Sequence, residues 1–212
     1  MYPSILDKNE LFLLKKLSFL KKLGFYLAGG TGLALQLGHR TSVDLDFYTP
    51  KSFKIENITR LFDSEIPQIK ITGTARGTIF GKFKKTEFSL FYYPYELLNS
   101  FISFEQILLA SIQDIAAMKI TAVVQRGTKR DFIDIYYLLK KYPLKKLISW
   151  AIKKYPSYQQ MLLLKALIYF KDAEEKKEKR EIKILDKKFS WEKAKKEIFE
   201  EVKKYQLEMI SP

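Results

Sequence analysis

The chain has 212 residues, 47% of them hydrophobic, and a formal net charge of +14 at pH 7. This length fits one domain, alone or with a helical extension, and the composition excludes a largely disordered protein. Because the sequence has no cysteine, disulfide scaffolds, cysteine-ligated metal centres and thiol catalysis are excluded.

The positive charge is concentrated in the first 170 residues, where 25 Lys and Arg stand against 13 Asp and Glu, a difference of +12. This balance favours a polyanionic partner such as a nucleotide or nucleic acid, or else a lysine-rich solvated surface. No apolar run approaches the ~18 residues of a membrane span. We therefore expect a cytoplasmic protein with no membrane partner.

Hydrophobic periodicity predicts an N-terminal α/β part. The expected helices are 7–23, 31–37 and 57–64, and the expected strands are 25–28, 43–48, 68–74, 78–83 and 87–93. Glycine and proline residues punctuate these segments.

The rest of the chain is predicted to be helical. The expected helices are 111–124, 129–141, 144–154, 157–170 and 189–207, with a charged helix or linker at 171–188. The predicted fold class is α+β, a mixed sheet with flanking helices followed by an α-helical C-terminal half. We place the two domains at residues 1–100 and 101–212.

Two glycines, Gly29 and Gly30, lie between a predicted strand and a predicted helix. They let the backbone approach a ligand closely, and the helix N-terminus and the Thr31 hydroxyl suit a phosphate. Taken alone, the glycine pair is better explained by a tight turn that needs glycine for its backbone geometry.

Asp44 and Asp46 are two residues apart in the predicted strand 43–48. The two-residue period puts both carboxylates on one face, where they repel each other unless a cation joins them. A hard divalent cation such as Mg²⁺, or Mn²⁺, would meet that need. Two solvated aspartates on a half-exposed strand remain the alternative.

Three groups of residues carry a family resemblance. They are Leu27–Thr31 with Leu33–Arg40, Ser42–Phe47 with Tyr93–Tyr95, and Asp114–Lys119 with Arg126–Tyr136. Together they resemble the nucleotidyltransferases of the AbiEii/AbiGii toxin family, which are similar to the minimal, polymerase-beta-like nucleotidyltransferase fold. The resemblance spans roughly residues 10 to 140.

The resemblance implies metal-dependent transfer of a nucleotide from an NTP to an acceptor, with RNA of the tRNA class expected and a cognate antitoxin as a possible partner. It implies Gly30 and Thr31 at the phosphates, Asp44 and Asp46 as catalytic metal ligands, and Lys119 and Asp131 as catalytic residues of the helical half. The alternatives are a non-catalytic nucleotide- or RNA-binding protein and a small-molecule nucleotidyltransferase.

Lys119 lies in an apolar stretch of a predicted helix, and Arg126 is seven residues on along the same face. Lys119 must meet an anion or extend to solvent, and both cations are candidate nucleotide ligands. Asp131 would act as a general base or would orient Lys119, although an acid near a helix start also suits the helix dipole. Asp134 would form an ordinary i,i+4 pair with Arg130.

The family fold usually carries a third carboxylate on a later strand. Here Ser89 stands at that position, and Glu87 is two residues away on the same face. This difference places the usual carboxylate base in question. His39, the sole histidine, is expected to be solvated in the loop before the aspartate pair.

Overall fold

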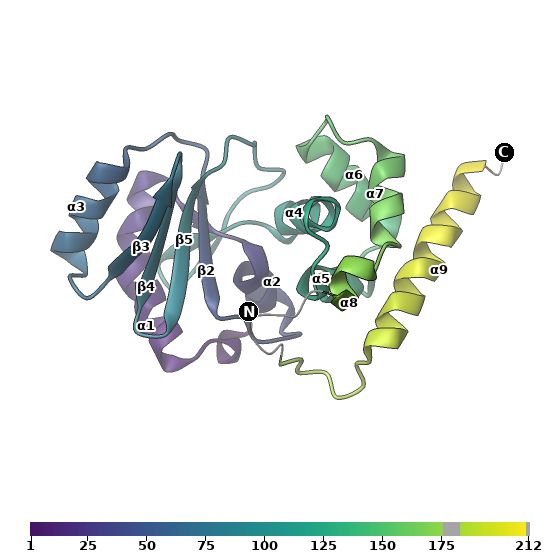
Figure 1. Cartoon of the computed structure of the whole chain (residues 1–212), viewed down its shortest axis with the longest axis horizontal. Coiled ribbons are helices and arrows are strands. Elements are labelled where there is room, and N and C mark those ends of the chain that lie inside the picture. Colours follow the sequence, from purple (N-terminus) through teal and green to yellow (C-terminus); the bar gives the residue numbers. More distant parts are fainter. Residues whose placement is uncertain (176–182, 211–212) are drawn as a thin grey trace. The chain divides into compact units, whose positions relative to one another are not determined.

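The computed structural model describes residues 1–175 and 183–210, and the chain divides into two compact units, residues 1–111 and 112–212. The described part of unit 1 holds a seven-stranded mixed sheet (Figure 1). Its strands are β1 (Tyr26–Leu27), β2 (Asp44–Thr49), β3 (Lys70–Ala75), β4 (Thr78–Phe83), β5 (Thr86–Tyr92), β6 (Ile102–Phe104) and β7 (Ile107–Leu109). Its helices are α1 (Lys8–Lys16), α2 (Gly29–Leu37) and α3 (Ile55–Glu65), with 3₁₀ turns at Pro3–Ile5 and Leu17–Leu23.

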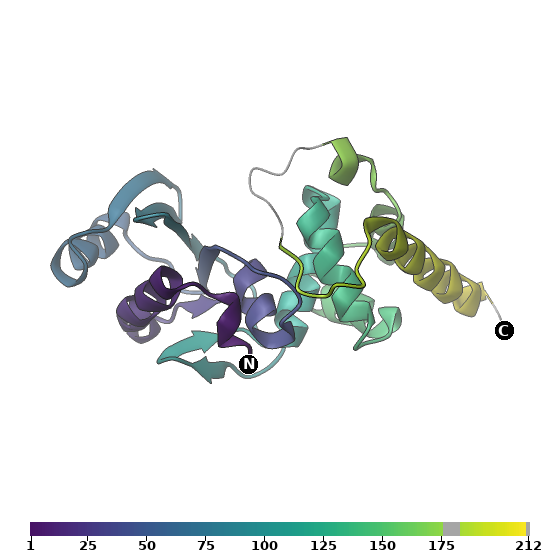
Figure 2. The same cartoon turned by 90° about the horizontal axis from the view of Figure 1, so that it is seen from below.

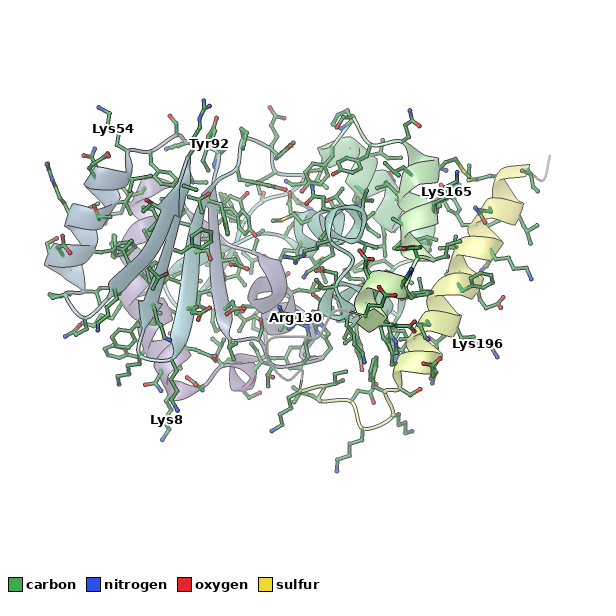
Figure 3. The ribbon with its side chains drawn as sticks, viewed as in Figure 1. Lys8, Lys54, Tyr92, Arg130, Lys165 and Lys196 are labelled. Carbon is green, nitrogen blue, oxygen red and sulfur yellow. The ribbon has the colours of Figure 1, made fainter. Side chains whose placement is uncertain are left out.

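The strands lie in the order β3-β4-β5-β2-β1-β7-β6. β2 runs parallel to β5, and β1 runs parallel to β7, whereas the other neighbours are antiparallel. Figure 3 labels Tyr92, the last residue of β5, at one end of the strands, and Lys8 of helix α1 beyond their other end. Because Thr49 pairs with Tyr92, β2 begins with Asp44 at the end away from Tyr92.

One face of the sheet is covered by helices α1 and α3, which lie on the same side of the strands (Figure 2). Phe62 of α3 packs against Phe88 of β5 with ring centroids 5.3 Å apart, and Phe12 of α1 stacks on Phe83 of β4 at 5.6 Å. The strand residues that alternate toward these helices are buried: Leu45, Phe47, Ile79, Phe83, Phe88 and Leu90. Burial of each such side chain stabilises the fold by about 1.5–3 kcal/mol.

The register defines two rows of side chains on the opposite face. Asp44 pairs with Glu87, and Glu87 pairs with Lys82. Asp46 pairs with Ser89, and Ser89 pairs with Phe80. Directly paired residues project from the same side of a sheet, so these six side chains share one face.

Three local differences separate the structure from the sequence-based expectation. The α-helix expected over 7–23 ends at Lys16 and continues as a 3₁₀ helix to Leu23, where Gly24 caps it with φ +82°. The helix expected from residue 31 begins at Gly29. The short strands β6 and β7, which were not predicted from the sequence, complete the sheet.

Unit 2 is helical in its described residues. It contains α4 (Ile112–Gln125), α5 (Lys129–Leu139), α6 (Leu144–Lys154), α7 (Gln160–Leu167), α8 (Lys171–Glu175) and α9 (Trp191–Ile210). Helix α4 packs against α5, α6 and α7. Of the charged stretch 171–188, residues 176–182 lie outside the described residues. Within residues 1–175 and 183–210, no helix is long and apolar enough to cross a membrane.

Candidate functional site

Gly29 lies directly against the second aspartate of β2. Its φ of +62° belongs to the left-handed region, and a Cβ built on it would lie 2.8 Å from Asp46 Oδ2. Both the backbone conformation and the available space therefore require glycine at this position. The glycine motif and the aspartate strand, which are separate segments of the sequence, thus form one local structure.

Gly30 in the first turn of α2 makes room for an arginine. A Cβ on Gly30 would lie 2.6 Å from Arg40 Nη2 and 3.2 Å from Ser42 Oγ. Arg40 is buried, and its Nη1 donates a hydrogen bond to the carbonyl oxygen of Thr41 at 3.0 Å. A guanidinium group is thus fixed at the start of a helix, where the backbone N–H groups already favour an anion.

Thr31 is fully buried and connects α2 to the beginning of β2. Its hydroxyl donates to the carbonyl oxygen of Asp44 at 2.5 Å and lies 2.9 Å from Ser42 Oγ, whose hydroxyl can donate to it. The structure therefore gives Thr31 a role in positioning Asp44. The predicted contact of Thr31 with a phosphate stays a prediction.

The carboxylates of Asp44 and Asp46 are half-buried on the same face of β2, as the alternation predicted. Two further acids, Asp7 and Glu10, lie in the neighbourhood, because Asp44 and Asp7 both act electrostatically on Glu10. Burial, the largest cause, and the charges of Asp7 and Asp44 raise the pKa of Glu10 above its ordinary value, against a hydrogen bond from the Asp7 N–H. The start of β2 is therefore an electronegative place that a cation would stabilise.

The aspartate pair fits a divalent cation that is completed by substrate. Across residues 1–175 and 183–210, no cluster of three or more His, Cys, Asp or Glu side chains could hold a metal. Mg²⁺ is usually bound by one or two carboxylates together with substrate phosphates and water. Asp44 and Asp46, beside a helix N-terminus and Arg40, provide that kind of incomplete site.

In unit 2, Lys119 is buried and lies between two carboxylates. Its Nζ is 3.0 Å from Asp131 Oδ1 and 2.7 Å from Asp134 Oδ2, and all three side chains are at most 5% exposed. Lys119 thus meets two anionic groups within unit 2, and its predicted contact with a nucleotide stays a prediction. The carboxylate of Asp134 is buried against Lys119, and its expected i,i+4 pair with Arg130 stays a prediction.

Asp131 accepts hydrogen bonds from four donors. Besides Lys119, Arg126 donates from Nε at 2.8 Å and from Nη2 at 2.9 Å, and Thr128 Oγ1 donates at 2.6 Å. Burial opposes ionisation of Asp131, but Lys119, Arg126 and Thr128 together hold its pKa well below the ordinary value. A carboxylate that stays ionised accepts a proton poorly, so the geometry favours Asp131 as the residue that orients Lys119 and Arg126.

The predicted site residues thus form two local groups. Unit 1 brings together Gly29, Gly30, Thr31, Asp44 and Asp46, and unit 2 brings together Lys119, Arg126 and Asp131. His39 is 3% exposed, so the expectation of a solvated histidine was wrong. Sequence reasoning missed Arg40 and Ser42 as neighbours of Gly30, and their position just before the Asp-x-Asp strand was the available signal.

The sequence matches the family described as nucleotidyl transferase AbiEii toxin of type IV toxin–antitoxin systems over residues 13–208. An uncharacterized protein of Aquifex aeolicus (strain VF5) is 38% identical over 157 residues, which cover 71% of this chain and 76% of that protein.

Solved structures show the same fold. A Helicobacter pylori protein described as a nucleotidyltransferase has a TM-score of 0.58 at 19% identity, covering 98% of this chain and 100% of its own. The nucleotidyltransferase toxin MenT4 of Mycobacterium tuberculosis has a TM-score of 0.52 at 13% identity, covering 91% and 82%. The chain therefore belongs to the AbiEii nucleotidyltransferase toxin family and has the nucleotidyltransferase fold.

Proposed function

We propose that this nucleotidyltransferase moves a nucleoside monophosphate from an NTP to an RNA acceptor, with Mg²⁺ or Mn²⁺ held by Asp44 and Asp46. The observation that carries the proposal is the close approach of Gly29 to Asp46, which puts the helix N-terminus and the carboxylate pair in one place. The proposed context is a toxin–antitoxin pair in the cytoplasm, with a cognate antitoxin as partner.

Each part of unit 1 has a task in this proposal. The N-terminus of α2 and the guanidinium of Arg40 bind and orient the phosphates, while Thr31 fixes the main chain at Asp44. When bound, the metal supplies charge neutralisation at the phosphate oxygens. The excess of 25 Lys and Arg over 13 Asp and Glu in residues 1–170 supports a polyanionic acceptor.

Unit 2 contributes a preorganised cationic group. Arg126 has 60% of its side chain exposed while its guanidinium is held by the buried carboxylate of Asp131. We assign contact with an anionic substrate to Arg126, and a positioning role to Lys119 and Asp131. This assignment replaces the general-base role of Asp131 with one that its depressed pKa supports.

A second candidate function is nucleotide or RNA binding without turnover. It is favoured by Ser89, which pairs directly with Asp46 at the position where a third carboxylate was expected. This candidate predicts metal-dependent NTP binding without transfer of label.

The test is incubation with each α-labelled NTP, Mg²⁺ and total RNA, followed by gel electrophoresis. We expect labelled RNA with the wild type and none with Asp44→Asn or Asp46→Asn. Asp63→Asn, which makes the same change at an exposed residue of α3, is the matched control and should retain transfer. Equal labelling by all four proteins would refute the assignment of the site.

A further inference from the structure

The sheet face that carries Asp44 and Asp46 also carries an exposed aromatic ring, in the same row as Asp46. Phe80 of β4 pairs with Ser89 of β5, and Ser89 pairs with Asp46 of β2. Neighbouring strands are about 4.8 Å apart, so Phe80 lies roughly two strand spacings, about 10 Å, from Asp46. Phe80 is 41% exposed, whereas Ile79 and Gly81 on either side of it are buried.

A pair of lysines stands one row away on the same face. Lys70 of β3 pairs directly with Lys82 of β4, and Lys82 pairs with Glu87 of β5. Lys70 and Lys82 are both exposed. Like charges placed directly opposite each other on neighbouring strands destabilise a sheet, and an anion between them would remove that cost.

The side chain between the ring and the carboxylate pair is small. Ser89 separates Phe80 from Asp46, and its half-buried hydroxyl leaves more room than a carboxylate would. From β2 toward the sheet edge, one row of the face thus presents Asp46, Ser89 and the Phe80 ring, and the neighbouring row presents Asp44, Glu87 and the two lysines. An aromatic ring next to cations is the combination that binds an unpaired nucleotide, through stacking of the base and attraction of its phosphate.

The direction from which an acceptor would approach the aspartates of β2 agrees with this arrangement. Helix α2, which is assigned to the phosphates of the NTP, begins after β1, on the other side of β2 from β5 and β4. In phosphoryl-type transfer the attacking and leaving oxygens are roughly in line, so an acceptor approaches from the side opposite the leaving pyrophosphate. On that side of β2 lie β5, with Ser89, and β4, with Phe80.

We propose that Phe80, with Lys70 and Lys82, forms the acceptor platform of unit 1: it stacks an unpaired base of a nucleic-acid acceptor and holds the adjacent phosphate. The inference rests on the proposed function, because it takes Asp46 as the reaction centre. It makes the acceptor a single-stranded nucleic-acid segment. It also makes Phe80 a residue that sets acceptor affinity without contributing to NTP binding.

The test measures two affinities in the full-length protein. Fluorescence anisotropy with labelled oligouridylate and oligoadenylate reports acceptor binding, and titration of NTP with Mg²⁺ reports the nucleotide site. We expect Phe80→Ser to weaken oligonucleotide binding by about 5-fold or more, the equivalent of the roughly 1 kcal/mol that one base–aromatic stack contributes. Phe80→Tyr should restore it, and NTP affinity should stay at the wild-type level in both variants.

Two further variants separate stacking from charge. Lys70→Gln with Lys82→Gln should reduce the slope of log affinity against log salt by about 1 for each phosphate that the lysines neutralise in the wild type. Phe199→Ser, which removes a ring 47% exposed on α9, is the matched control and should bind the oligonucleotides as the wild type does.

Three results would overturn the proposal of an acceptor platform. The first is unchanged oligonucleotide binding by Phe80→Ser with a lowered melting temperature, which would mean that the ring only covers Gly73, its partner on β3. The second is equal weakening of oligonucleotide binding in Phe199→Ser. The third is absence of oligonucleotide binding by a wild type that binds NTP. Failure of the proposed function is distinguishable, because the wild type itself would then either not bind NTP or bind it without transferring label to RNA.

Discussion

Gly29 and Asp46 touch each other, and their close approach leaves no space for a side chain on the glycine. A Cβ would lie 2.8 Å from Asp46 Oδ2, and the φ of +62° adds backbone strain to any substitution. We predict that Gly29→Ala costs about 1–3 kcal/mol of stability and displaces the Asp46 carboxylate, so that metal-dependent NTP binding is abolished. Denaturant unfolding and NTP titration measure the two effects.

The control for this prediction is Gly24→Ala. Gly24 also has a positive φ, of +82°, but its nearest neighbours are atoms of Lys51 and Thr49 at 3.4–3.5 Å. It should lose similar stability and keep NTP binding. Loss of NTP binding in both variants would mean that strain in unit 1, and not displacement of Asp46, is responsible.

The ion pairs of Lys119 make a second prediction. Lys119→Met keeps most of the side-chain length but removes the positive charge that compensates the buried carboxylates of Asp131 and Asp134. We expect a loss of about 3–5 kcal/mol, because removing one partner of a buried pair strands the other charge. Lys171→Met, which breaks a pair with Glu175 that is more than 60% exposed on both sides, should change stability by less than about 1 kcal/mol. Equal melting temperatures for the two variants would contradict the conclusion that Lys119 is buried between Asp131 and Asp134.

The pKa of Asp131 predicts how stability depends on pH. Its carboxyl is buried, which opposes ionisation, but Lys119, Arg126 and Thr128 hold the folded-state pKa below the ordinary value. The stability it contributes is therefore fully present above the unfolded-state pKa of about 4 and is lost as the pH falls below that value toward the folded-state pKa. Carbon-13 NMR of the carboxyl group should show no titration of Asp131 between about pH 5 and 8. A midpoint within that window would instead support a general-base role.

Ser89 makes a prediction about metal binding. Ser89→Asp would place a third carboxylate directly opposite Asp46. Without metal, repulsion among the acids should lower the melting temperature, and with Mn²⁺ the variant should be stabilised more than the wild type. Ser89→Asn, which has nearly the same shape without the charge, should show neither effect. If Mn²⁺ stabilises the aspartate and asparagine variants equally, the metal is not bound at Asp46.

The sequence predicted the parts of the site that depend on local patterns. The two-residue alternation placed Asp44 and Asp46 on one face of β2, and the family resemblance selected Lys119 and Asp131, which the structure brings within 3.0 Å. The α6 helix, Leu144–Lys154, matched its predicted bounds because its apolar period and the preceding proline are local signals.

Other features depend on tertiary packing that no local pattern reports. Strands β6 and β7 have three residues each, so their alternation is too short to predict a strand. They are stabilised by tertiary pairing, because β6 pairs with β7 and β7 pairs with β1. The guanidinium of Arg40 reaches Gly30 only because the chain folds back between α2 and β2. Burial of Asp134 against Lys119 requires α4 and α5 to pack, whereas the sequence offered a nearer partner on the same helix.

The central claim is that the chain transfers a nucleotide, and the position of the label in the product tests it most directly. RNA is incubated with Mg²⁺ and either α-labelled or γ-labelled NTP, with the wild type and with Asp46→Asn. We predict that only the α label enters RNA and that the γ label leaves as pyrophosphate. In Asp46→Asn, neither labelled RNA nor labelled pyrophosphate should form. Entry of the γ label into RNA would show phosphoryl transfer instead, and α-label entry that is unaffected in Asp46→Asn would contradict the site described above.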